Sequence, residues 1–242
     1  MKFSQIPRIY ANIKLIESCL LELSRDNMHY LKTVLRLRVG DSFRIFNNQD
    51  GEFIAQITDI TKNNLSAQIN NVFRAITPEP EIILGLSIIK NDRMLDAINM
   101  AVQLGATKIV PLVTQRVQSG NINSQKLVKC IIEYTQQSER LVPPTLEPTI
   151  VLPLFLEQYY NKFILYANEN EEDNNTLFRF ATTLPASIIM IVGPEGGYSA
   201  SELKLLVSTD NCHSISLGSS VLRTETAVAA CLAQIKLLRL NY

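Results

Sequence analysis

Alternating apolar and polar positions mark the first third of the chain. Residues 42–46 and 52–57 show the two-residue period of half-buried strands, and apolar side chains recur at every second position over residues 65–69. The segment between the first two strands, residues 47–51, ends in Asp-Gly, a pair typical of tight hairpins. One helix is predicted over residues 29–35. This pattern favours a small β-barrel with a single helix.

A pair of prolines separates this pattern from a different one. Pro78 and Pro80 stiffen and extend the chain, as is typical of a linker. We therefore expect one domain at residues 1–75 and a second at residues 76–242. In the second, short apolar runs predict strands at residues 82–89, 108–113, 163–167, 188–192 and 214–217.

Amphipathic helices are predicted between these strands. Asp92 is expected to cap a helix that Gly105 ends, and Ser199 with Glu202 forms a capping box at the start of another. Further helices are expected around residues 127–132 and over residues 224–238. Strands that alternate with helices indicate a parallel sheet covered on both faces, which is an α/β fold.

One polar segment interrupts the alternation. Residues 168–175 follow a predicted strand and are rich in asparagine and acidic side chains. Charge runs of this kind are usually solvated. We therefore expect a solvated loop here rather than part of a site.

Composition restricts the class of protein. Apolar residues make up 46% of the 242 and charged residues 19%, as in ordinary globular proteins. Basic and acidic residues number 23 each, so no global positive field indicates nucleic acid, although a local patch could still bind it. The four scattered cysteines predict neither a metal site nor a disulfide framework. With no membrane-length apolar run and no cleavage signature, we expect a cytoplasmic protein without membrane contact.

Two glycine-containing loops near the end of the chain carry the candidate chemistry. The first, Gly-Pro-Glu-Gly-Gly at residues 193–197, follows an apolar strand. Ligands of open α/β sheets bind at the carboxyl ends of strands, and glycine lets the backbone approach a ligand closely. The segment matches neither a P-loop nor a dinucleotide fingerprint. Taken by itself, the segment is better explained as a helix-capping turn than as a binding loop.

The second loop, residues 217–227, adds ionisable side chains at the start of a predicted helix. Arg223 could bind a phosphate or polarise a base, and Glu225 could orient that arginine or accept a proton. A surface ion pair at a helix N-terminus would explain the same two residues. The residues alone leave both interpretations open.

Together, the two loops resemble the RsmE family of SPOUT-class RNA methyltransferases. The matching residues are Gly193-Pro-Glu-Gly-Gly197 with Ser199 and Glu202, and Leu217-Gly218 with Val221-Leu-Arg-Thr-Glu-Thr-Ala227. Upstream likenesses at residues 7–8, 29–41, 104–111 and 137–143 extend the resemblance over nearly the whole chain.

The resemblance implies a PUA-like RNA-binding barrel followed by a parallel-sheet SPOUT domain with a trefoil knot. It also implies a homodimer that uses S-adenosylmethionine, without a metal, to methylate N3 of one uridine in 16S ribosomal RNA, free or within the small ribosomal subunit. The cofactor pocket would be formed by Gly193, Glu195, Gly196, Gly197, Leu217, Gly218, Val221 and Leu222. Arg223 would stabilise charge on the target base, and Glu225 would accept its proton. Because the sulfonium is cationic, a nearby carboxylate such as Glu195 is expected.

RNA contact is assigned to scattered cations as a group, although each one taken singly is better explained as an ordinary solvated residue. The expected contacts are Arg8, Arg36, Arg38, Arg116 and Arg140. The chain departs from the usual family pattern where Met100, Gln103 and Gln136 replace charged residues.

Two other functions remain possible from the sequence. A different SPOUT enzyme, such as a tRNA ribose 2′-O-methyltransferase, could share the second domain, but the PUA-like barrel favours the first interpretation. A non-catalytic RNA-binding or assembly factor could keep the fold, but the intact loops argue against it.

Overall fold

The computed structural model describes residues 6–117, 122–172 and 174–239, and the chain forms two compact units. Asp173, within the predicted polar loop, lies outside the described residues. The first unit comprises Met1–Pro78 and Thr135–Pro143, and the second Glu79–Tyr134 and Pro144–Tyr242. The division after Pro78 lies close to the predicted linker. The return of Thr135–Pro143 to the first unit was not predicted, because it depends on contacts between residues far apart in sequence.

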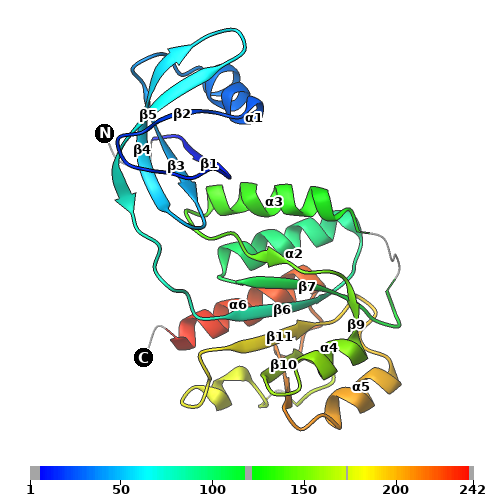
Figure 1. Ribbon diagram of the computed structural model, residues 1–242. Coiled ribbons are helices and arrows are strands. Elements are labelled where there is room, and N and C mark those ends of the chain that lie inside the picture. Colours follow the sequence, from blue (N-terminus) through cyan, green and yellow to red (C-terminus); the bar gives the residue numbers. More distant parts are fainter. Residues whose placement is uncertain (1–5, 118–121, 173, 240–242) are drawn as a thin grey trace. The chain divides into compact units, whose positions relative to one another are not determined.

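A five-stranded sheet forms most of the first unit (Figure 1). Its predicted strands are present as β3 (Ser42–Asn47), β4 (Gly51–Ile60) and β5 (Leu65–Arg74), which pair antiparallel. The short strands β1 (Arg8–Tyr10) and β2 (Leu20–Glu22) complete the order β1-β3-β4-β5-β2. At three residues each, they are too short to show an alternation in the sequence.

The predicted helix of this unit begins earlier than expected. Helix α1 (Arg25–His29) starts after Ser24, whose hydroxyl accepts a hydrogen bond from Asn27 N, and a π-helical turn continues it over Tyr30–Val34. The alternating apolar side chains of β3 and β4 lie in the core as predicted. The buried members from these strands are Phe43, Ile45, Phe53, Ala55 and Ile57.

The second unit contains a sheet in which every pairing is parallel, as the alternation predicted. The strand order is β12-β10-β11-β6-β7-β8, and β9 also pairs with β7. The strands are β6 (Ile82–Ser87), β7 (Lys108–Val113), β8 (Thr145–Leu146), β9 (Ile150–Val151), β10 (Phe163–Ala167), β11 (Ile188–Val192) and β12 (Cys212–Ile215). Strand β12 begins and ends two residues before the predicted bounds.

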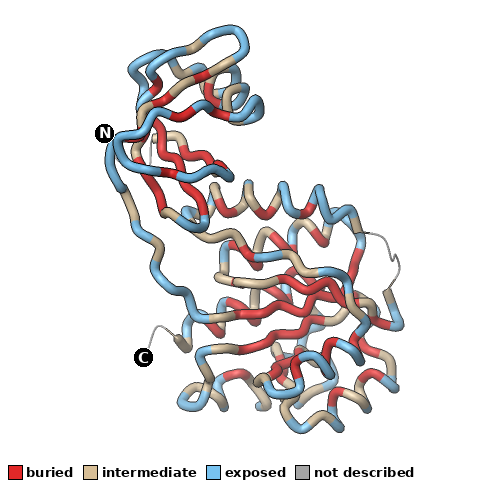
Figure 2. Tube along the Cα trace, viewed as in Figure 1, coloured by how far each residue is buried: buried red, intermediate tan, exposed pale blue. Residues whose placement is uncertain are grey.

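Helices cover both faces of this sheet, and the strands between them are buried (Figures 1 and 2). One face packs against α2 (Asn91–Gln103), α3 (Ser124–Gln137) and α6 (Thr224–Arg239). The other packs against α4 (Leu152–Gln158) and α5 (Ala200–Val207). Asp92 is not the cap of α2, because the helix already begins at Asn91 after Lys90, so Asp92 lies in its first turn, where an acid is favoured. Gly105 follows the end of α2 with φ 94°, as expected for its stop signal.

Within the described parts of the chain, no helix has both the length and the apolarity to cross a bilayer. The same residues contain no group of three or more potential metal-ligating His, Cys, Asp or Glu side chains.

Candidate active site

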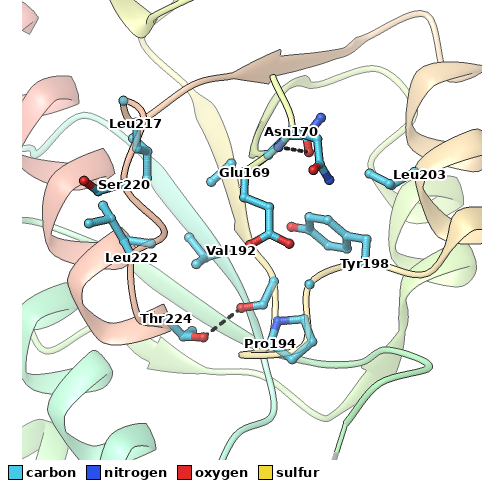
Figure 3. Close-up of a pocket in the computed structure, with 16 residues that line it drawn as sticks. Glu169, Asn170, Val192, Pro194, Tyr198, Leu203, Leu217, Ser220, Leu222 and Thr224 are labelled. Carbon is cyan, nitrogen blue, oxygen red and sulfur yellow. Dashed lines mark hydrogen bonds between the residues drawn. The ribbon is translucent and has the colours of Figure 1, made fainter. Parts of the chain in front are cut away.

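A pocket opens where the loops after three neighbouring strands meet. Strand β10 lies between β11 and β12, so the loop that follows β10 lies between the two glycine loops. The pocket holds about 620 Å³ of empty space including its open mouth, within the size range of small-molecule sites. It is lined by Ala167, Asn168, Glu169, Asn170, Val192, Gly193, Pro194, Gly197, Tyr198, Leu203, Leu217, Gly218, Ser220, Leu222, Thr224 and Ala227 (Figure 3).

The first glycine loop forms one wall of this pocket. Its turn is closed by a hydrogen bond from Gly197 N to the Pro194 carbonyl at 2.9 Å, and Gly197 has φ 66°. The carbonyl of Gly193 accepts a 3.1 Å hydrogen bond from Oγ1 of Thr224, which ties this loop to the start of α6. A Cβ atom at Gly193 would lie 3.0 Å from the ring of Tyr198. Glycine at this position therefore lets the loop pack closely against the Tyr198 ring.

Two arginines hold the outer part of the same loop. Arg93 forms a 3.1 Å ion pair with Glu195, and Arg116 donates a 2.7 Å hydrogen bond to the Gly196 carbonyl. Neither Glu195 nor Gly196 lines the pocket. These contacts fix the outer part of the loop, and the two residues expected from the sequence to hold the cofactor here lie outside the pocket lining.

The capping box predicted at the start of α5 is present. The Ser199 hydroxyl accepts from Glu202 N, and a carboxylate oxygen of Glu202 accepts from Ser199 N at 2.8 Å. The other carboxylate oxygen of Glu202 accepts a 2.8 Å hydrogen bond from Gln115 N. This buried carboxylate therefore joins the end of the first glycine loop to the segment after β7.

The second glycine loop supplies the opposite wall. Gly218 has φ 101°, a conformation that favours glycine, and its N–H donates to the hydroxyl of Ser216 at 3.1 Å. Leu217 and Leu222 line the pocket, whereas Val221 is 76% exposed and does not. Of the eight predicted cofactor residues, the pocket lining thus contains Gly193, Gly197, Leu217, Gly218 and Leu222.

The predicted catalytic pair lies at the N-terminus of α6, on either side of the pocket-lining Thr224. The side chain of Arg223 is exposed and forms no ion pair within the described residues. Glu225 lies in the first turn of the helix, is 9% exposed, and has one carboxylate oxygen without a hydrogen-bond partner. A buried, unpaired carboxylate oxygen is a potential proton acceptor.

The prediction of a purely solvated loop at residues 168–175 is wrong at its start. Asn168, Glu169 and Asn170 line the pocket, and Figure 3 shows the Glu169 side chain extending toward its middle. A Cβ atom at Gly197 would lie only 2.8 Å from Oε1 of Glu169. The sequence contained one usable signal, because this segment follows the carboxyl end of a predicted strand.

The predicted RNA contacts differ in their surroundings. Arg36, Arg38 and Arg116 are exposed, and Arg36 adopts φ 57° in the turn after the π-helical segment. Arg140 is half-buried. Arg8 is only 7% exposed, so its guanidinium is not available to a phosphate.

The burial of Arg8 follows from the contacts that it makes within the first unit. Its Nε donates to Glu52 at 2.6 Å, and Nη1 donates to the carbonyls of Thr135 and Gln136 at 2.9 and 3.0 Å. Nη2 donates to the carbonyl of Arg140. Desolvation by this burial lowers the pKa of Arg8. Arg8 thus holds Thr135–Pro143 on the sheet of the first unit.

The three uncharged replacements noted in the sequence have local partners. Oε1 of Gln136 accepts a 2.7 Å hydrogen bond from Tyr10 N, and Nε2 of Gln103 donates to Asn99 at 2.8 Å. Met100 packs against the core of the second unit. Gln136 therefore makes a structural contact that a neutral amide satisfies.

Models of protein families match both parts of the chain. An RNA methyltransferase domain matches residues 77–236, and an RNA methyltransferase PUA domain matches residues 23–70. Ribosomal RNA small subunit methyltransferase E of Rickettsia conorii is 48% identical over 233 residues, covering 96% of this chain and 95% of that protein.

Solved structures have the same fold. A methyltransferase from Legionella pneumophila, in complex with S-adenosylmethionine, superposes with a TM-score of 0.87 at 28% identity and 98% coverage of both chains. Ribosomal RNA small subunit methyltransferase E from Neisseria gonorrhoeae, bound to S-adenosylmethionine, gives 0.83 at 24% identity, covering 97% of this chain and 98% of that one.

Proposed function

The chain belongs to the ribosomal RNA small subunit methyltransferase E family, and on that premise we propose that it methylates N3 of a specific uridine in 16S ribosomal RNA. The methyl donor is S-adenosylmethionine. The observation that carries the proposal is the pocket between the two glycine loops, in a chain whose Legionella neighbour binds this cofactor.

The pocket residues fit such a cofactor. Val192, Leu217 and Leu222 offer apolar surface to a flat heterocycle, and the glycine loops bring backbone groups close to it. Polar side chains from the loop after β10 can meet ribose hydroxyls. When bound, S-adenosylmethionine supplies a methyl group carried on a positively charged sulfonium.

Arg223 and Glu225 have complementary roles in the proposed reaction. N3 of uridine must lose its proton as the new N3–carbon bond forms and the carbon–sulfur bond breaks. The exposed guanidinium of Arg223 stabilises the negative charge on the uridine carbonyl oxygens. The unpaired carboxylate oxygen of Glu225 supports a role as the proton acceptor, directly or through a water.

The remaining parts of the proposal concern the assembly and its location. We place RNA contact at Arg36, Arg38, Arg116 and Arg140, and leave out the buried Arg8. Family resemblance supports a knotted SPOUT domain and a homodimer, and the 76% exposed Val221 beside the pocket is available to a second copy. A ribosomal RNA substrate supports action in the cytoplasm.

The test is to map methylated nucleosides in ribosomal RNA from cells with and without this protein. We expect one N3-methyluridine in 16S RNA that disappears without the protein and returns with the wild-type chain. We also expect Arg223→Ala and Glu225→Gln to lower the rate of transfer by at least about 100-fold while cofactor binding changes little.

Two results would contradict these assignments. Loss of a ribose methylation in tRNA, with 16S RNA unchanged, would indicate a different SPOUT enzyme. Full turnover by Glu225→Gln would remove that residue as the proton acceptor, leaving the proposed reaction intact.

A further inference from the structure

The pocket lining contains a single charged side chain among the described residues, the carboxylate of Glu169. The other lining residues are apolar, glycine, or neutral polar residues. The carboxylate expected from the sequence beside the sulfonium was Glu195, but that residue is paired with Arg93 and does not line the pocket. The structure therefore presents a different acid to the cofactor.

The Glu169 carboxylate lies directly against a glycine of the facing loop. Oε1 of Glu169 would lie 2.8 Å from a Cβ atom at Gly197, so the carboxylate occupies space that any side chain at that position would fill. Glu169 forms no ion pair within the described part of the chain. Its negative charge is thus not neutralised by a neighbouring arginine or lysine.

Glu169 is exposed in the free chain, so its interaction with a ligand is strengthened only when the bound ligand itself displaces water from the pocket. Val192, Leu217 and Leu222 line the same pocket and exclude water when a ligand fills it. The hydroxyl of Tyr198 is buried without a hydrogen-bond partner, and its ring extends toward the pocket (Figure 3). Burial raises the pKa of Tyr198 well above its usual value, so this neutral hydroxyl adds no charge to the pocket.

We propose that Glu169 makes the pocket select the cationic sulfonium of S-adenosylmethionine over the neutral thioether of S-adenosylhomocysteine. This inference rests on the proposed function, because it assumes that the pocket holds this cofactor. Methyl transfer removes the positive charge at sulfur, so the attraction to Glu169 exists before transfer and is lost after it. The same carboxylate therefore favours binding of S-adenosylmethionine before transfer and release of S-adenosylhomocysteine after it.

Calorimetry with three ligands tests the proposal without any need for turnover. The ligands are S-adenosylmethionine, S-adenosylhomocysteine and sinefungin, whose amine carries a positive charge near the sulfonium position. We expect Glu169→Gln to weaken binding of the two cations about tenfold and binding of the neutral thioether less than about twofold. Glu172→Gln is the matched control, since this exposed acid lies in the same loop but outside the pocket lining.

The possible outcomes separate this inference from the proposed function. Equal weakening of all three ligands would overturn charge selection and assign Glu169 to a part that they share, such as the ribose. An effect of the same size in Glu172→Gln would overturn it as well, because the charge of the whole loop would then be responsible. If the wild-type chain binds none of the three, the proposed function fails, and this inference fails with it.

Discussion

Gly197 affects the geometry of the pocket in two ways. Its φ of 66° closes the turn of the first glycine loop, and its missing side chain leaves room for Glu169. The positive φ and the lack of room for a Cβ atom are separate reasons for glycine at this position. The two requirements can be distinguished by comparison with a glycine that has a positive φ but free space around it.

We predict that Gly197→Ala weakens S-adenosylmethionine binding by about tenfold or more, because Cβ displaces the Glu169 carboxylate and strains the turn. Gly105→Ala is the control, since Gly105 has φ 94° but no heavy atom within 4 Å of an added Cβ. Both variants should lose about 1 kcal/mol of folding stability from backbone strain. Calorimetry measures the affinity for S-adenosylmethionine, and thermal unfolding measures the stability of both variants. Unchanged affinity in Gly197→Ala would contradict the predicted role of Gly197 in binding.

At the scale of elements, the first unit depends on the segment Thr135–Pro143. Besides Arg8, Arg44 binds this segment through a two-pronged contact with Glu139, with both N···O distances at 2.6 Å. Arg74 joins the same network through Glu52 at 2.6 Å. The network links strands β1, β3, β4 and β5 to a segment that lies 65 to 132 residues further along the chain than the arginines that contact it.

This network predicts a pH dependence of stability. The hydrogen bond from Arg44 lowers the pKa of Glu139 below its ordinary 4.5. A carboxyl whose folded-state pKa is depressed stabilises the fold above its unfolded-state pKa, and this contribution is lost as the pH falls through the folded-state value. We therefore expect the urea midpoint of the wild-type protein to fall more steeply below about pH 4.5 than that of Glu139→Gln.

Glu17→Gln, an exposed acid of the same unit, serves as the control and should keep the wild-type pH profile. Parallel profiles for the wild-type protein and Glu139→Gln would show that the contact with Arg44 contributes no net stability, as is common for partly exposed ion pairs.

At the scale of the whole molecule, the chain has no net charge, so RNA affinity must come from local cations. The exposed arginines of the proposed contact set occur in both units. Each neutralised phosphate releases counterions, which makes the affinity depend on salt concentration.

We predict that replacing both Arg36 and Arg38 with alanine weakens RNA binding. The plot of log affinity against log salt concentration should also become less steep, its negative slope shrinking in magnitude by about 1.5. Lys62→Ala is the control, since this exposed cation lies in the turn between β4 and β5, outside the proposed set. Titrations of a 16S RNA fragment at several salt concentrations measure both slopes. Salt-independent binding by the wild-type protein would contradict the proposed contacts.

The sequence by itself determined most of the longer strands and helices and the position of the two glycine loops. Strands β7, β10 and β11 have the predicted bounds, because buried parallel strands are continuous apolar runs. The capping box at Ser199 and the resemblance to the family likewise depend on residues close together in sequence.

Only the tertiary structure decided which side chains share the pocket. The order β12-β10-β11 inserts the loop after β10 between the two glycine loops, and so brings Glu169 to the pocket. The same level of structure pairs Glu195 with Arg93 and buries Arg8 against Glu52. Patterns in the local sequence cannot reveal these contacts, because they join residues that are up to about 100 positions apart and are brought together only by the order of the strands.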